Sequence, residues 1–263
     1  MASLKSISRD TRRLAAGWRW RAGVILGTPI PAEYDDDLAA TMKAVRRHTL
    51  TSPARIAALV DAVSYVVAEG IDGDLVECGV WKGGSVMAAA LTLDRLGHRE
   101  RDLYLFDTFA GMPKPGAEDV SSPYDGYSVH KRWRRHDKVD KEWAGIPVET
   151  VRANVLSTGY PAERIKCVVG MVEETIPAEA PERIALLRLD TDWYSSTKHE
   201  LETLYPRLVD GGVLIVDDYG HYEGARQAVD EYFAESGQRV LLSRIDYTGR
   251  LAVKQSANGA GPS

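Results

Sequence analysis

Cysteine and long apolar runs are both scarce in this chain of 263 residues. The two cysteines, Cys78 and Cys167, each lie in a short apolar run and not in the close pairs that bind metals. We expect both to be reduced, buried thiols, which fits a cytoplasmic protein. No run approaches the roughly 18 apolar residues of a membrane-spanning helix. Residues 23–27 are too short for the core of a signal peptide, so neither kind of segment is expected.

A strong excess of charge of one sign is also missing. The chain has 33 basic and 38 acidic residues, for a formal net charge of −5. This balance does not favour binding to nucleic acid or to a membrane surface. With 44% hydrophobic residues, the chain has the composition of one large globular domain. Chemistry on a small molecule is therefore the expected class of function.

Two apolar segments of strand length, residues 184–189 and 212–216, end abruptly in acidic residues. The acids that follow them are Asp190, Asp192, Asp217 and Asp218. Segments that are apolar throughout are typical of buried parallel strands, whose carboxyl ends meet at one edge of a sheet. Carboxylates gathered there repel one another unless a cation or a shared proton offsets their charge, which predicts a site. Asp192 stands just before a predicted helix, and we interpret it as a helix cap instead.

An earlier part of the chain has the pattern of a nucleotide-binding half-sheet. A strand at 73–79 leads through a glycine-rich turn into a helix, and a second strand then ends at Asp107. The turn Gly79-Val-Trp-Lys-Gly-Gly84 does not match the Gly-x-Gly-x-x-Gly fingerprint of dinucleotide-binding enzymes. Its bulky Trp81 leaves less room for a pyrophosphate, so a nucleotide without phosphate is favoured.

The remaining segments suggest how the domain is organised. We expect an N-terminal extension at 1–35, a single α/β domain at 36–255 and a disordered tail at 256–263. An aperiodic insertion at about 114–146 is interpreted as a lid. Its cluster His130-Lys-Arg-Trp-Arg-Arg-His136 either binds a phosphate or carboxylate of the substrate or forms a solvated basic face. The extension contains two tryptophans, from which we expect a subunit contact and a homo-oligomer.

Four blocks of sequence together resemble the macrocin O-methyltransferase family of antibiotic biosynthesis. They are Val76-Glu-Cys-Gly-Val-Trp-Lys-Gly-Gly-Ser85, Phe106-Asp-Thr-Phe-Ala-Gly-Met-Pro113, Leu187-Arg-Leu-Asp-Thr-Asp192 and Ile215-Val-Asp-Asp-Tyr219. The resemblance implies a Rossmann-like class I methyltransferase fold, with helices on both faces of a seven-stranded, mostly parallel sheet. The predicted strands at 239–242 and 250–253 would form its antiparallel terminal hairpin. Members of the family use S-adenosylmethionine and Mg²⁺ to methylate sugar hydroxyls.

The resemblance also implies roles for individual residues. The expected cofactor-binding residues are Glu77, Gly79, Trp81, Ser85, Asp107, Thr108, Met171 and Val172, with Asp107 on the ribose and the last two beside the adenine. The expected Mg²⁺ ligands are Asp190, Asp217 and Asp218. The more distant catechol O-methyltransferases have a lysine base three residues beyond the first metal-binding acid, where this chain has Trp193. Asp190 is therefore the expected base, unless the cation alone activates the hydroxyl.

The resemblance, together with the acidic strand ends, implies an S-adenosylmethionine-dependent, Mg²⁺-dependent O-methyltransferase. Its acceptor would be a hydroxyl of a deoxysugar, carried either by a glycosylated natural product or by a nucleotide sugar. One alternative is methylation of a phenol or catechol, which can chelate the same cation. Another is a cofactor-binding module without catalysis, but such a module has no need to gather carboxylates.

Overall fold

The computed structural model describes residues 34–120, 128–134 and 145–256. The predicted extension and tail therefore lie almost entirely outside the described residues, as does much of the predicted lid. Seven strands are found in the described part: β1 (Asp74–Cys78), β2 (Leu103–Asp107), β3 (Ile165–Val169), β4 (Ile184–Leu189), β5 (Leu208–Val216), β6 (Ser243–Arg244) and β7 (Arg250–Val253).

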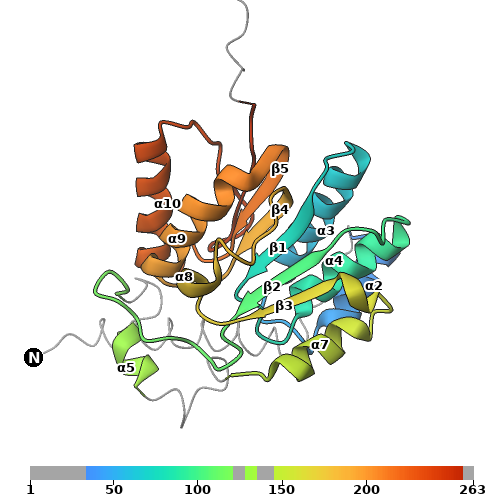
Figure 1. Ribbon diagram of the computed structural model, residues 1–263, viewed down its shortest axis with the longest axis horizontal. Helices are drawn as coiled ribbons and strands as arrows, with labels where there is room; N and C mark the ends of the chain where they lie inside the picture. Colours follow the sequence, from blue (N-terminus) through green and yellow to red (C-terminus); the bar gives the residue numbers. More distant parts are fainter. Residues whose placement is uncertain (1–33, 121–127, 135–144, 257–263) are drawn as a thin grey trace, which may run out of the picture.

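The strands form one sheet with the order β3-β2-β1-β4-β5-β7-β6. Neighbours from β3 to β5 pair in parallel, whereas β7 runs antiparallel to both β5 and β6. The chain moves outward from β1 to β3 on one side and from β4 to β5 on the other (Figure 1). The order of strands thus reverses between β1 and β4, the position at which sheets of this kind bind ligands. The predicted fold class is confirmed.

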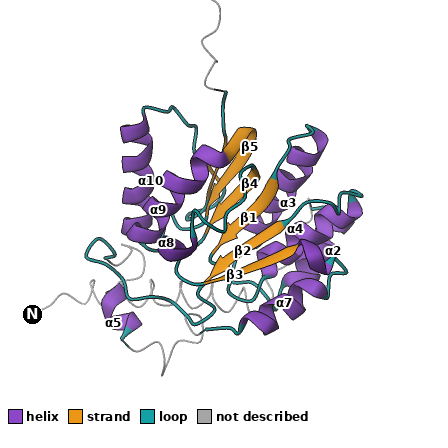
Figure 2. Cartoon of the chain, viewed as in Figure 1, coloured by secondary structure: helices purple, strands orange, loops and turns teal. Residues whose placement is uncertain are grey.

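Helices cover both faces of the sheet (Figures 1 and 2). One face carries α2 (Asp36–Val45), α3 (Pro53–Ala68), α4 (Gly84–Arg95) and α7 (Val148–Leu156). The other face carries α8 (Val172–Thr175), α9 (Tyr194–Leu204) and α10 (Glu223–Ser236). The short helix α5 (Val129–Trp133) lies off the edge where the parallel strands end, and 3₁₀ turns occupy Ala162–Arg164 and Tyr205–Arg207.

Local sequence explains where the first helices start. The Asp35 carboxylate accepts the backbone N–H of Leu38 at 2.7 Å and so caps α2. Ser52 caps α3 in the same way through the N–H of Arg55, and Pro53 occupies the first helical position, where its missing N–H costs nothing.

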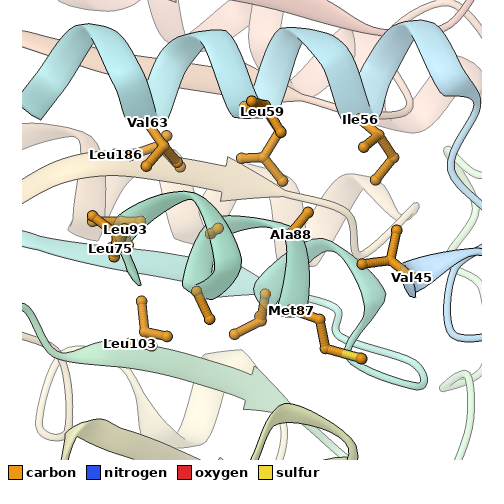
Figure 3. Close-up of a cluster of buried hydrophobic side chains, with 14 of the residues drawn as sticks. Val45, Ile56, Leu59, Val63, Leu75, Met87, Ala88, Leu93, Leu103 and Leu186 are labelled. Atoms are coloured by element: carbon orange, nitrogen blue, oxygen red, sulfur yellow. The ribbon is translucent and has the colours of Figure 1, made fainter. Parts of the chain in front are cut away.

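The apolar faces of α3 and α4 pack on the sheet in layers (Figure 3). The side chains that meet there are almost completely buried: Ile56, Leu59 and Val63 from α3, Met87, Ala88 and Leu93 from α4, and Leu75, Leu103 and Leu186 from the strands. Each large aliphatic side chain buried in this way contributes roughly 1.5–3 kcal/mol. This core fixes α4 against β1, and thereby positions the turn that joins them.

The predicted strand at 239–242 is wrong, because β6 starts only at Ser243 and pairs through two residues. Val240 and Leu242 pack against the sheet core, while Leu241 between them is 79% exposed. The alternation of apolar residues at 240–242 therefore does correspond to buried and exposed side chains, but this segment is not part of a strand. Asp246 then accepts from the N–H groups of Thr248 and Gly249 and forms the tight turn into β7.

The cysteine prediction is only partly met, since Cys78 is buried and Cys167 is half-buried. Both are free thiols, and β2 lies between their strands. Among the residues that the structure describes, no helix combines the length and the apolarity needed to cross a bilayer.

Two glycines with nearly equal backbone angles provide a test of the packing at the sheet edge. Gly79 has φ +82° and Gly97 has φ +77°. A Cβ at Gly79 would lie 2.0 Å from the carbonyl oxygen of Asp190, whereas nothing lies within 4 Å of one at Gly97. Both alanine variants carry the left-handed cost of roughly 1–2 kcal/mol. We expect Gly79→Ala to lower the melting temperature at least about twice as far as Gly97→Ala, since 1 kcal/mol shifts it by roughly 2–4 °C. Equal shifts in thermal melts would contradict the close approach of β1 and β4.

Candidate active site

Strained backbone marks the edge where the parallel strands end. Among the described residues, three other than glycine have a positive φ: Trp81 at 48°, Phe109 at 52° and Asp192 at 69°. Trp81 lies three residues beyond the end of β1, Phe109 two residues beyond the end of β2 and Asp192 three residues beyond the end of β4. Such conformations cost energy and are kept where the surrounding structure demands them, often at functional sites.

Asp107 joins the first two of these turns. Its Oδ2 accepts the N–H of Val80 at 2.7 Å and that of Trp81 at 3.2 Å, and its Oδ1 accepts the N–H of Phe109 at 2.8 Å. The N–H of Gly170, just after β3, donates to the Asp107 carbonyl at 3.0 Å. The structure thus brings the predicted cofactor residues at the ends of β1, β2 and β3 to one place.

The turn after β1 leads directly into the start of α4. Its N-cap is Gly83, with φ +86° and no capping side chain, and Ser85 in its first turn is buried. The indole N–H of Trp81 is buried and finds no hydrogen-bond partner among the described residues, although the Lys82 ammonium lies 4.4 Å from the ring centroid. A buried donor without an acceptor is costly, so it points to a ligand.

The three other predicted cofactor residues, Thr108, Met171 and Val172, have different positions. The Thr108 hydroxyl donates to the Gly111 carbonyl at 2.8 Å and shapes the turn after β2. Met171 is the N-cap of α8. The side chain of Val172 is buried in the core on the α9 face, so it is the backbone there that can border a ligand.

A buried arginine lies between the cofactor turn and the acidic strand ends. Arg188 on β4 is 2% exposed, and its Nη1 lies 2.5 Å from Glu77 Oε1 and 2.7 Å from Asp190 Oδ2. Its Nη2 lies 2.6 Å from Asp217 Oδ1 and donates to the Thr51 hydroxyl at 3.1 Å. One guanidinium therefore pairs with three carboxylates, which lie on β1 or directly after β4 and β5.

Burial weakens the ionisation of the Glu77 carboxyl. It raises the pKa of Glu77 to about 7, against the opposing pull of the Arg188 charge. Sequence reasoning gave Glu77 a cofactor role and did not consider Arg188. The available signal was a charged residue inside an otherwise apolar strand, which requires buried partners of opposite charge.

Asp217 faces the same arginine and a second one. Its Oδ2 pairs with Nη1 of Arg55 from α3, and Arg55 Nε lies 3.1 Å from Asp246 Oδ2. The Asp217 side chain is 4% exposed. Both of its oxygens are thus held by arginines in the described structure.

Asp190 and Asp218 lie close to Asp192, and not to Asp217 as predicted, as the third acid. Oxygen atoms of Asp190, Asp192 and Asp218 lie within 4.8 Å of one another, and we call these three residues the acid cluster. Asp218 is buried, and its Oδ2 lacks a hydrogen-bond partner among the described residues. Burial raises the pKa of Asp218 well above its usual range, and the charges of Asp192 and Asp190 raise it further. Three carboxylates with an unsatisfied buried oxygen fit a hard divalent cation.

The interpretation of Asp192 as a helix cap is wrong. The N-cap of α9 is Trp193, which makes no capping hydrogen bond through its side chain. The backbone N–H of Tyr194 is instead accepted by Asp119 Oδ1 at 2.8 Å, from a distant part of the chain. Asp192 is therefore a member of the acid cluster that sequence reasoning set aside.

The predicted basic cluster is only partly described. Residues 130–134 belong to α5 or its end, and residues 135 and 136 lie outside the described residues. The Trp133 indole N–H donates to the Met112 carbonyl at 3.0 Å, which attaches α5 to the loop after β2. A phosphate-binding role for this cluster stays a prediction.

Comparison with known proteins gives one family. The family model described as macrocin-O-methyltransferase (TylF) matches residues 34–253. Over 202 residues, 77% of this chain, it is 37% identical to an 8-demethyl-8-(2,3-dimethoxy-alpha-L-rhamnosyl)-tetracenomycin-C 4'-O-methyltransferase of Streptomyces olivaceus, and covers 74% of that protein. It is 32% identical to a demethyldecarbamoylnovobiocin O-methyltransferase of Streptomyces niveus, with the same two coverages. It is also 32% identical to a mycinamicin III 3''-O-methyltransferase of Micromonospora griseorubida, over 77% of this chain and 76% of that one.

Solved structures agree on the fold. The O-methyltransferase NovP has a TM-score of 0.71 and 27% identity, over 94% of this chain and 99% of that one. A calicheamicin methyltransferase has a TM-score of 0.58 at 21% identity, over 96% of this chain and 94% of that one, and it supports the fold alone. The predicted family resemblance is confirmed.

Removing Arg188 tests whether the acidic edge depends on it. Arg188→Met leaves Glu77, Asp190 and Asp217 without their shared counter-ion, and breaking a buried ion pair in this way costs roughly 3–5 kcal/mol. We expect a loss of that size in the free energy of unfolding, measured by urea titration. Arg188→Lys should recover only part of it, because the ammonium lacks the planar fork of donors.

Arg183→Met is the matched control on the same segment. The ion pair of Arg183 with Asp72 has side chains 60% and 79% exposed, so its loss should change stability by less than about 0.5 kcal/mol. Similar losses for the Arg183 and Arg188 variants would show that the buried network is not stabilising.

Proposed function

The chain belongs to the macrocin-O-methyltransferase family, and from that premise we propose that it methylates a sugar hydroxyl of a glycosylated natural product. The methyl donor would be S-adenosylmethionine, assisted by Mg²⁺. The observation that carries the proposal is the position of the acid cluster beside the cofactor turn: the Asp190 carbonyl is packed so closely on Gly79 that no side chain fits between them. A donor on the turn and an acceptor on the cluster would therefore be held next to each other.

S-adenosylmethionine would supply the sulfonium methyl group. Support for its site comes from the turn of Gly79 and Trp81, from Ser85 at the start of α4, and from Asp107 and Thr108 at the end of β2. Asp107 is fixed by three backbone N–H groups and so is already oriented for ribose hydroxyls. We retain Met171 and Val172 beside the adenine, and Glu77 on the methionine side, as parts of this proposal.

Mg²⁺ would supply positive charge that lowers the pKa of the acceptor hydroxyl. Asp190 and Asp218 belong to the predicted ligand set and lie in the acid cluster. Asp217, the third predicted ligand, would first have to leave Arg188 and Arg55. We therefore favour Asp192 over Asp217 as the acid that completes the negative charge around the cation.

The hydroxyl proton has to pass to a carboxylate of the same cluster. Asp190, the predicted base, already accepts from the Arg188 guanidinium at 2.7 Å. Asp192 lies within reach of both other acids, on a strained turn that the surrounding contacts maintain. We propose Asp192 as the proton acceptor and keep Asp190 as the residue to compare it with.

The acceptor is inferred from the relatives. The names of two of them give a rhamnosyl-tetracenomycin and mycinamicin III, and no nucleotide sugar, as what they methylate. A deoxysugar on a finished glycoside is therefore favoured over a nucleotide sugar. Assembly as a homo-oligomer and a cytoplasmic location stay predictions.

Product analysis by mass spectrometry tests the function. The purified chain would be incubated with S-adenosylmethionine, Mg²⁺ and one of three acceptors: a rhamnosylated polyketide, a nucleotide deoxysugar or a catechol. We expect a mass gain of one methyl group on the glycoside, lost when a chelator removes the cation. Methylation of the catechol alone would establish the phenolic alternative. Cofactor binding without any methylated product would favour the module without catalysis.

Two adjacent acids should respond in opposite ways to loss of charge. Because burial raises the pKa of Asp218, the folded chain retains a proton there that the unfolded chain releases above about pH 4. Stability without a cation therefore falls as pH rises toward that raised pKa. We expect Asp218→Asn to raise the melting temperature of chelator-treated protein at pH 8 by several degrees, at roughly 2–4 °C per kcal/mol, and to abolish the further rise on adding Mg²⁺.

Asp217→Asn is the matched variant. It takes a charged partner from both Arg55 and Arg188, so the melting temperature should fall with or without Mg²⁺. If both variants shifted the melting temperature in the same direction, the division between an ion-paired Asp217 and a cation-binding Asp218 would be wrong.

A further inference from the structure

A buried aspartate far from the acid cluster in sequence caps the helix that follows that cluster. Asp119 is 1% exposed and accepts the backbone N–H of Tyr194, the first residue of α9, at 2.8 Å. The residue just before a helix ordinarily provides such a cap with its own side chain. Here the cap comes from a loop 75 residues earlier in the chain.

The second oxygen of Asp119 shapes its own loop. Asp119 Oδ2 accepts the N–H of Gly116 at 2.7 Å, so one carboxylate joins the loop to the start of α9. Gly224 in the first turn of α10 completes the joint, because a Cβ there would lie 2.1 Å from Asp119 Oδ1. The loop after β2, α9 and α10 thus meet at this carboxylate.

The same loop is attached to α9 at a second point. The Trp193 indole N–H donates to the Pro113 carbonyl at 3.0 Å. Trp193 is almost completely buried and packs against Val129 and Tyr222. Residues 193 and 194 are therefore both held by the segment 113–119, immediately after Asp192.

These contacts provide the cap that Asp192 would otherwise be expected to supply. An acid one residue before the N-cap is near enough to turn toward the open N–H groups of α9, where the helix dipole attracts it. With Tyr194 already capped, Asp192 instead adopts φ 69° and lies with Asp190 and Asp218. We propose that Asp119 is a positioning residue that keeps Asp192 in the acid cluster by capping α9 in its place. This inference rests on the proposed cation site.

Cation affinity, measured by titration calorimetry with Mg²⁺ in the absence of donor and acceptor, tests the proposal. Asp119→Ala opens the N-terminus of α9, and Asp192 can then turn to cap it. We expect affinity to fall by about fivefold, the equivalent of a typical cap. Asp119→Asn keeps one oxygen for the Tyr194 N–H and loses only the acceptor of the Gly116 N–H, so its affinity should stay within about twofold of the unmodified chain. Circular dichroism of each variant verifies that it is folded.

Glu118→Ala is the matched control. Glu118 is the exposed neighbour of Asp119, so this variant loses the same charge from the same loop without touching α9. Its affinity should also stay within about twofold. A fall equal to that of Asp119→Ala would mean that the loop acts through its charge, and the proposal would be overturned.

A double-mutant cycle separates positioning from a general structural effect. If Asp119 acts through Asp192, Asp119→Ala should cause no further loss of affinity in a chain that already carries Asp192→Asn. Additive losses would overturn the positioning role while leaving the proposed cation site intact. If the unmodified chain binds no Mg²⁺, the cation site itself is wrong, and this inference fails with it.

Discussion

The active edge of the sheet depends on one buried guanidinium. Arg188 contacts one carboxylate on β1, one directly after β5 and one directly after its own strand β4. Without it, Glu77, Asp190 and Asp217 would place several negative charges in a nearly dry space, which is far too costly unless some are protonated. With it, the ends of three strands are fixed relative to one another, and the cofactor turn and the acidic strand ends become one rigid unit.

Arg188 pairs with Asp190, one member of the acid cluster, and with Asp217 outside it. Asp217 is shared between two arginines, but the buried Oδ2 of its neighbour Asp218 finds no hydrogen bond within the described residues. Adjacent residues at a strand end point to opposite faces, which places Asp217 toward α3 and Asp218 toward the acid cluster. The charge of Asp217 is thereby paired within the protein, whereas the buried Oδ2 of Asp218 is the atom that the proposed cation would satisfy.

Much of this arrangement could be predicted from the sequence. The parallel strands, the glycine turn, Asp107 and the acidic ends of β4 and β5 follow from hydrophobic runs and their boundaries. The choice between Asp192 and Asp217 could not be made in that way, because the boundary of a strand does not give the direction of the side chains beyond it. The missing clue was Arg188. It pairs in register with Glu77 on β1 and lies two residues from Asp190 on the same face of the sheet. Its positive charge therefore attracts the carboxylates on that face.

The helix-cap rule failed at Asp192 for a related reason. Local rules assume that each helix is capped by its own neighbours, and a distant carboxylate can take over that task. Two aspartates do so along this edge: Asp107 accepts backbone N–H groups from the turns after β1 and β2, and Asp119 joins the loop after β2 to the start of α9. Each of the three strained residues follows a strand that these two carboxylates connect. The strain therefore persists because side-chain bonds from other loops hold it, and those bonds are invisible to any rule that reads one segment at a time.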